Sequence, residues 1–273
     1  IALDETVDLP DLQDLLVANN ENVGNVTLSI RKDLQEEARN ALGEREGSVV
    51  LLDLKSGAIE AFWSYPSFDP TAISSTDRDQ MEAAWNLYNV DPRKPLLAHQ
   101  YQERYFPGST FKLVTAGTGL LTGKVKPTDQ FPSVTSYTPP QTTRPISNFG
   151  GGVCGGDFFT IIANSCNAAF AEMGQATIGP VDMVKGAESF GFNQASPIDL
   201  PAPATSNFPT DVIGTPNPPK LAMSSIGQND VAATPLQMAL VASAAANGGT
   251  IMKPTVMREV RTSEGRVAKT AAP

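Results

Sequence analysis

The sequence predicts an α+β fold in which a mainly antiparallel sheet is flanked by helices. Residues 48–54 and 58–63 are apolar, strand-like runs joined by a Lys-Ser-Gly turn. Residues 256–261 and 266–270 form a second such pair around Ser-Glu-Gly. Stretches with helical spacing separate the two pairs, most clearly after residues 109 and 234. A chain of 273 residues is long enough to bury a substantial core.

Composition argues against several classes of function. The formal net charge of −9 disfavours a nucleic-acid partner and adhesion to anionic lipid. One histidine and two cysteines are too few for an ordinary zinc site, so we expect no bound metal. No Gly-x-Ser-x-Gly elbow accompanies His99, and we therefore expect that histidine to be an ordinary loop residue.

The first part of the chain predicts a short leader and then the start of the main domain. Residues 1–22 are acidic and end in an Asn-rich break, so we expect the tail of a preceding domain or a linker. The main domain is expected to span residues 23–273. It opens with a strand at 26–30 and a helix at 33–42, and the uniformly apolar run after Ser48 predicts a strand covered on both faces.

Residues 71–104 predict a polar connection with one helix, and a second helix follows it. One helix is expected around residues 78–88, and the second runs from Ser109 to about Gly123. Gly117 and Gly119 lie inside the second helix at a cost of about 1 kcal/mol each, which a close packing partner would explain. Residues 124–152 predict loop with short strands.

The start of the second helix carries a candidate nucleophile. Ser109 follows a Pro-Gly turn, and Lys112 lies three residues on, so hydroxyl and amine share one helix face. A lysine whose pKa is lowered by burial can take the proton of a serine hydroxyl. The alternative is a helix cap beside a solvated lysine. A second Ser-x-x-Lys, Ser29 to Lys32, joins a strand to a helix and is expected to be structural.

A second candidate stretch is Ser165-Cys166-Asn167, which lies between two helical runs. A serine can relay a proton, while an amide side chain can both donate and accept hydrogen bonds. The alternative is a polar helix–helix turn. A third stretch, Gly227-Gln228, leads into a helix with Thr234 as N-cap and Pro235 at its first position.

In this order the three stretches closely resemble the transpeptidase domain of class B penicillin-binding proteins. The resemblance covers residues 23–273 and is nearest to the actinobacterial penicillin-binding protein A type. It implies a penicillin-binding and serine β-lactamase-like transpeptidase fold that includes an all-α subdomain. It also implies Ser109 as nucleophile, Lys112 as base, Ser165 as proton relay and Asn167 as the residue that positions the substrate amide.

The activity implied by the resemblance is that of a D,D-transpeptidase. Such an enzyme cross-links peptidoglycan stem peptides through a serine acyl-enzyme, is acylated by β-lactam antibiotics and needs no metal or organic cofactor. The implied location is the extracytoplasmic face of the bacterial plasma membrane, with an anchor outside this chain. Cell-wall synthesis or cell-division proteins are the implied partners.

Two other functions stay open. A serine β-lactamase or D,D-carboxypeptidase shares these motifs but uses water as acceptor, although no residue here is recognisable as a water-activating base. A non-catalytic β-lactam sensor would be acylated but would join no peptides.

The sequence departs from the family in one important place, because no Lys-Thr-Gly follows the third stretch. The nearest match, Lys269-Thr270-Ala271, falls in the second arm of the predicted hairpin, and Ala271 carries a Cβ where the family has glycine. We therefore expect the domain to be C-terminally incomplete. Further strands and a terminal helix would come from polypeptide beyond Pro273. The sequence also departs from the family at Arg31 and at residues 97–99, but these positions do not belong to the three stretches that carry the candidate catalytic residues.

The two cysteines are expected to form a disulfide. Cys154 and Cys166 are 12 residues apart, and glycines flank the first of them on both sides. The enzyme implied by the resemblance works outside the cytoplasm, where disulfides persist. Closing so short a loop would contribute about 3 kcal/mol and restrain Ser165 and Asn167. The alternative for Cys166 is a small buried side chain without a partner.

Overall fold

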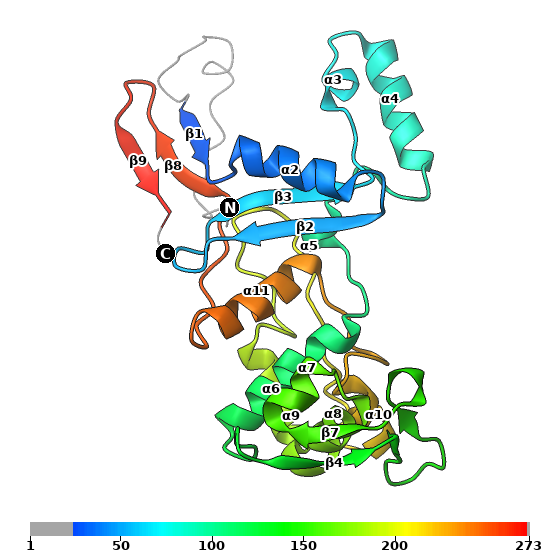
Figure 1. Ribbon diagram of the computed structural model, residues 1–273. Coiled ribbons are helices and arrows are strands. Elements are labelled where there is room, and N and C mark those ends of the chain that lie inside the picture. Colours follow the sequence, from blue (N-terminus) through cyan, green and yellow to red (C-terminus); the bar gives the residue numbers. More distant parts are fainter. Residues whose placement is uncertain (1–23, 272–273) are drawn as a thin grey trace. The chain divides into compact units, whose positions relative to one another are not determined.

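The computed structural model describes residues 24–271, so the leader expected over residues 1–22 lies outside the described residues (Figure 1). The chain divides into two compact units. One comprises the described parts of residues 1–96, 197–203 and 251–273, and the other comprises residues 97–196 and 204–250. Helices and antiparallel strands occur throughout, which confirms the predicted α+β class. No helix among the described residues is long and apolar enough to cross a membrane.

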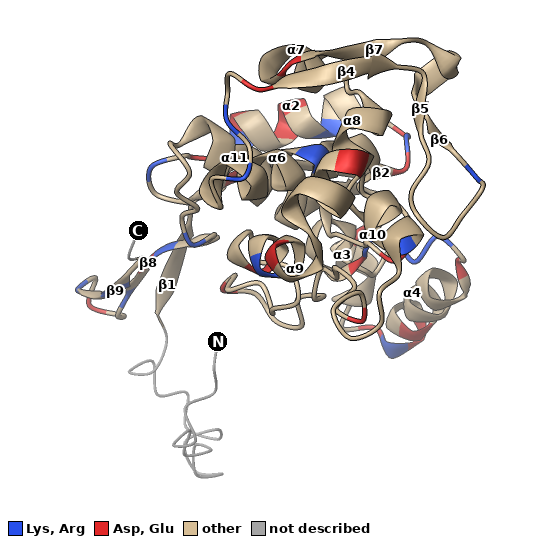
Figure 2. Cartoon of the chain, turned by 90° about the horizontal axis from the view of Figure 1, so that it is seen from below, with Lys and Arg blue, Asp and Glu red and all other residues tan. Residues whose placement is uncertain are grey.

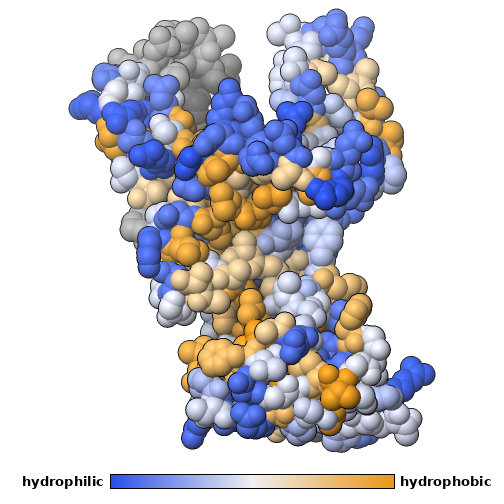
Figure 3. All heavy atoms as spheres, viewed as in Figure 1, coloured by the Kyte–Doolittle hydropathy of each residue, from blue (hydrophilic) through white to orange (hydrophobic). Residues whose placement is uncertain are grey.

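The first unit contains the predicted hairpin of β2 (Gly47–Leu52) and β3 (Ile59–Tyr65). Helix α2 (Lys32–Leu42) packs on β3, and the Gln35 amide exchanges hydrogen bonds with the backbone of Phe62 at 2.7 and 3.0 Å. Residues of β3 are either buried or half-buried. Strand β2 is mostly half-buried, with Leu51 41% exposed, so the expectation that β2 is covered on both faces is wrong for the described chain. In Figure 3, which has the view of Figure 1, hydrophobic residues (orange) lie at the surface in the region of this hairpin.

A second sheet in this unit has the order β1–β8–β9, built from β1 (Asn25–Leu28), β8 (Met257–Arg261) and β9 (Val267–Thr270). The β8–β9 hairpin confirms the prediction for residues 256–270, and Lys269 lies in it opposite Val260. The pairing of β1 with β8 was not predicted. Ser29 donates to the carbonyl oxygen of Ile59 at 2.7 Å, so this serine has a structural role, as expected.

The polar connection of the first unit contains α3 (Pro70–Ile73) and α4 (Arg78–Val90). The second of these confirms the helix predicted at 78–88, and the Asp77 side chain caps its first turn. In the second unit, α5 (His99–Gln102) begins at His99, which is 5% exposed and contacts Glu103 through Nδ1. The expectation that His99 is a loop residue is therefore wrong.

The second unit is mainly helical. After α5, its helices are η2 (Gly108–Phe111), α6 (Lys112–Leu121), α7 (Phe158–Ala163), α8 (Asn167–Glu172), η4 (Met173–Ile178), α9 (Pro180–Ser189), α10 (Pro218–Ser224) and α11 (Pro235–Ala246). Thr234 and Pro235 start α11 as predicted. A Cβ at Gly117 would lie 2.7 Å from Phe190, and one at Gly119 would lie 2.9 Å from Val125, which confirms close packing at both glycines.

Short strands lie against these helices, as the sequence of residues 124–152 predicted. They are β4 (Gln130–Val134), β5 (Ser136–Tyr137), β6 (Ile146–Ser147) and β7 (Cys154–Asp157), and the 3₁₀ turn η3 (Phe149–Gly151) precedes β7. Strand β4 pairs with β7, and β5 pairs with β6. Asp157 is the single charged residue in these four strands, and Figure 2 shows how few charges lie around them.

Candidate active site

Ser109 lies in η2, directly before α6 begins at Lys112. The turn that presents it needs glycine, because Gly108 has φ 54° and donates its N–H to the carbonyl oxygen of Gly227 at 2.9 Å. Phe111 is fully buried, stacked on Phe208 with its ring centroid 5.5 Å away. This anchor fixes the start of the helix, so that Ser109 is exposed while Lys112 is only 4% exposed.

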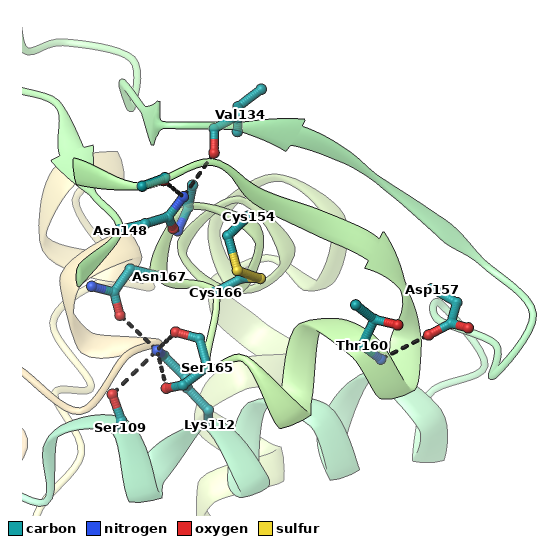
Figure 4. The surroundings of a disulfide bond; sticks show 12 residues. Ser109, Lys112, Val134, Asn148, Cys154, Asp157, Thr160, Ser165, Cys166 and Asn167 are labelled. Atoms are coloured by element: carbon teal, nitrogen blue, oxygen red, sulfur yellow. Dashed lines mark hydrogen bonds between the residues drawn. A yellow bond between two sulfur atoms is a disulfide. The ribbon is translucent and has the colours of Figure 1, made fainter. Parts of the chain in front are cut away.

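The amine of Lys112 brings the four candidate residues together (Figure 4). Its Nζ lies 3.2 Å from the Ser109 hydroxyl and 2.9 Å from the Ser165 hydroxyl. It also lies 2.7 Å from the Ser165 carbonyl oxygen and 2.6 Å from Oδ1 of Asn167. The structure therefore favours the catalytic interpretation of Ser109 and Lys112 over a cap beside a solvated lysine.

Burial lowers the pKa of Lys112 to about 8, because the charged form of the amine loses hydration. The ring of Phe170 lies 5.8 Å from Nζ on one side. At neutral pH an amine with this pKa is close to its titration range. It can therefore exchange a proton with a neighbouring hydroxyl at a modest free-energy cost.

The partners of Lys112 also decide where that proton goes. The Ser165 carbonyl and Oδ1 of Asn167 can only accept hydrogen bonds, so they engage two N–H bonds of the amine. The third proton of the ammonium, or the lone pair of the neutral amine, then faces the hydroxyls of Ser109 and Ser165. The arrangement suits proton transfer between two hydroxyls through one nitrogen.

Ser165 reaches this position because, directly after the C-cap of α7, it adopts a left-handed conformation with φ 53°. Its N–H donates to Ile162 O and the N–H of Cys166 donates to Ile161 O, both at 3.0 Å, which is a Schellman motif. Glycine is the usual residue at this position. Here the turned backbone directs both the carbonyl and the hydroxyl of Ser165 toward Lys112.

Asn167 is the first residue of α8. Its Nδ2 donates to the carbonyl oxygen of Ser147 in β6 at 3.0 Å, which turns Oδ1 toward Lys112. The Ser-x-Asn stretch is thus a helix–helix turn, and it also faces the candidate nucleophile.

Cys154 and Cys166 are joined by a disulfide, with their Cα atoms 5.5 Å apart. Cys154 belongs to β7 and Cys166 is the residue between Ser165 and Asn167, so the bond attaches the Ser-x-Asn turn to the β4–β7 pair. Figure 4 shows the sulfur atoms next to the Lys112 network. This pairing excludes the alternative of an unpartnered Cys166.

A cleft of about 380 Å³ opens at Ser109. Its lining residues are Ser109, Pro145, Ile146, Ser147, Asn167, Met223, Ile226 and Gln228. Pro145, Ile146, Ser147 and Met223 were missed from the sequence, because no motif marks them and their place depends on the fold. Gln228 lay within a recognised stretch but was given no role. The cleft combines apolar walls with two serines and two amide side chains, which suits a peptide-like ligand.

Comparisons with a family model and with curated proteins identify the same family. Residues 47–272 match the penicillin binding protein transpeptidase domain. The chain is 36% identical to the peptidoglycan D,D-transpeptidase PbpA of Mycolicibacterium smegmatis, over 96% of this chain and 54% of that protein. It is 32% identical to PbpA of Mycobacterium tuberculosis, over 92% of this chain and 52% of that protein. The chain thus spans about half the length of the curated relatives it matches.

Solved structures give the same result. Penicillin-binding protein A from M. tuberculosis, as a ceftriaxone acyl-enzyme complex, superposes with a TM-score of 0.84 at 30% identity, covering 96% of this chain and 59% of that one. The D,D-transpeptidase domain of a peptidoglycan glycosyltransferase from Eggerthella lenta superposes with a TM-score of 0.80 at 29% identity, covering 92% of this chain and 61% of that one.

Proposed function

Since the chain belongs to the penicillin-binding protein transpeptidase family, we propose that it is a serine D,D-transpeptidase that cross-links peptidoglycan stem peptides. The resemblance to class B penicillin-binding proteins and the transpeptidase fold that it implied are confirmed. The contacts that Lys112 makes with Ser109, Ser165 and Asn167 carry the proposal.

In the proposed acylation step, the neutral amine of Lys112 takes the hydroxyl proton of Ser109. The freed Oγ attacks the carbonyl carbon of the penultimate D-alanine of a donor stem peptide. The C–N bond to the terminal D-alanine then breaks. The leaving amine receives a proton through the Ser165 hydroxyl, which Lys112 resupplies. The products are an ester on Ser109 and free D-alanine.

In the second step an amine of a neighbouring stem peptide attacks the ester. Its proton passes through Ser165 and Lys112 to the Ser109 oxygen, and a new peptide bond forms as the C–O bond breaks. Asn167 orients the backbone amide of the donor peptide. Its side-chain amide can form further hydrogen bonds besides those to Lys112 and Ser147. A β-lactam acylates Ser109 in the same way, but its opened ring stays covalently attached and blocks the incoming amine.

The substrate class suggests where the protein works. Peptidoglycan is assembled outside the cytoplasm, so we place the protein on the outer face of the plasma membrane, together with cell-wall synthesis or division proteins. The Cys154–Cys166 disulfide supports an oxidising compartment. A membrane anchor, and the strands expected beyond residue 273, belong to this proposal as well.

Intact-mass analysis of the full-length protein after treatment with penicillin G tests the proposal. We expect one stable adduct that maps to Ser109 and is absent from Ser109→Ala. Ser29→Ala, which alters the second Ser-x-x-Lys, should be labelled like the wild type. A donor stem peptide and an amine acceptor should give a joined product.

Other results would identify the alternatives. Rapid hydrolysis of penicillin would indicate a β-lactamase, and release of D-alanine without joining would indicate a carboxypeptidase. A stable adduct without any reaction of stem peptides would indicate a sensor. A stable adduct on another serine would refute the assignment of Ser109.

A further inference from the structure

We propose that Asn148 is a positioning residue, which caps α8 from outside the helix and thereby holds Asn167 against Lys112. This inference rests on the proposed function, because it concerns the same site. Asn148 lies directly after β6, outside the three recognised stretches, and does not line the cleft.

The first observation is that α8 lacks a cap of its own. Its N-cap residue is Cys166, whose side chain makes no capping hydrogen bond and whose sulfur is bonded to Cys154. Serine, threonine, asparagine and aspartate fill this role in most helices. Here Oδ1 of Asn148, 20 residues earlier, accepts the N–H of Ala168 at 3.0 Å. An asparagine distant in sequence therefore supplies the missing cap.

The second observation is that Asn148 is itself firmly held. It is 6% exposed, and its Nδ2 donates to Val134 O at 2.7 Å and to Gly152 O at 3.1 Å. Both groups are carbonyls, so they fix which end of the amide points to α8. Figure 4 shows this side chain between β4 and the start of α8.

Together these contacts hold Asn167 from two directions. The carbonyl oxygen of Ser147 accepts a hydrogen bond from Nδ2 of Asn167. The side chain of the next residue, Asn148, accepts a hydrogen bond from the N–H of Ala168. The dipeptide 147–148 therefore sets both the amide orientation of Asn167 and the position of its backbone. Truncation of Asn148 would leave an N–H and two carbonyls without their partner and release the start of α8.

Two measurements on the full-length protein test the inference. The first is hydrogen exchange of the Ala168 amide, which we expect to accelerate in Asn148→Ala. The second is the acylation rate with penicillin G, which should fall by about 10²-fold, because small displacements of positioning groups carry such costs. The exchange measurement needs no acylation, so it tests the cap even if the proposed function fails.

Two variants serve as controls. Asp77→Ala removes a helix cap of the same kind, from Asp79 N–H to Oδ1 at 3.0 Å, on α4 in the first unit. It should destabilise that helix and keep its acylation rate. Asn148→Asp keeps an acceptor for Ala168 N–H but sets its second oxygen against the carbonyls of Val134 and Gly152, so it should not restore the wild-type acylation rate.

Several outcomes would overturn the inference. The first is acylation of Asn148→Ala at the wild-type rate, and the second is unchanged exchange at Ala168. The third is an equal loss of acylation in Asp77→Ala, since that would reduce the effect to general destabilisation. If the wild type itself is not acylated, the proposed function is refuted, and exchange at Ala168 alone decides whether Asn148 caps α8.

Discussion

The carbonyl oxygen of Ser165 lies 2.7 Å from Nζ of Lys112, and this contact exists because Ser165 adopts φ 53° at the end of α7. A residue with a side chain thus occupies a position where glycine is favoured. The cost of the left-handed conformation is about 1 kcal/mol for a residue other than glycine. In return, a hydroxyl and a carbonyl of one residue both face the proposed base.

We predict that Ser165→Gly is more stable than Ser165→Ala by about 1 kcal/mol, since glycine adopts φ 53° without strain. Both variants lose the hydroxyl that we propose as the proton relay, and they should be acylated much more slowly than the wild type. Denaturant unfolding and acylation kinetics measure the two effects. If alanine is tolerated as well as glycine, the backbone is not strained at this position.

The lowered pKa of Lys112 predicts how acylation depends on pH. In the proposed mechanism the neutral amine is the base, so the acylation rate should rise with pH and level off above the pKa of about 8. Lys112→Arg should abolish acylation at every pH, because a guanidinium does not lose its proton. Lys32→Arg, in the second Ser-x-x-Lys, is the matched control. Normal acylation of Lys112→Ala would mean that the base is elsewhere.

The same group should affect stability with a defined sign. The pKa of Lys112 is lowered in the folded protein from 10.5 to about 8, so the unfolded chain binds more protons between these values. The contribution of Lys112 to the free energy of unfolding therefore increases with pH across this range. The difference in unfolding free energy between wild type and Lys112→Met, measured from pH 7 to 10, should shift in favour of the wild type. A constant difference would contradict a buried amine.

Reduction of the disulfide should lower the free energy of unfolding by about 3 kcal/mol, since 12 residues separate Cys154 from Cys166. Acylation should slow as well, because the bond attaches the Ser-x-Asn turn to β7. Thiol counting under denaturing, non-reducing conditions should find no free thiol. The chain has two cysteines, so two free thiols would refute the bridge.

Gly227 should tolerate no side chain. An added Cβ would lie 2.1 Å from the carbonyl oxygen of Gly108 and 2.7 Å from Phe111 Cβ, at a residue with φ 74°. Gly227→Ala should therefore displace the turn that carries Ser109. We expect a loss of about 1–3 kcal/mol in stability and slower acylation. Gly214→Ala, where an added Cβ meets nothing within 4 Å, should change neither. Equal effects of the two substitutions would contradict this account.

The sequence by itself determined the features that depend on neighbouring residues. The spacing of Ser109 and Lys112 at a helix start, the cap at Thr234 and the two hairpins are encoded within a few residues of each other. Local periodicity and turn chemistry predict such features, and the structure contains them. The β2 and His99 expectations were wrong because burial depends on what packs against a segment, which its own composition does not reveal.

Tertiary structure decided what joins distant segments. The contact between Lys112 and Ser165 crosses 53 residues, and it forms because α6, α7 and α8 share one apolar core. The low pKa of Lys112 follows from that burial rather than from its sequence neighbours. The pairing of β1 with β8 and the cap that Asn148 places on α8 have the same origin. Hydrogen-bonding groups that packing removes from water must find partners wherever the chain brings them, and no local pattern records which partners those will be.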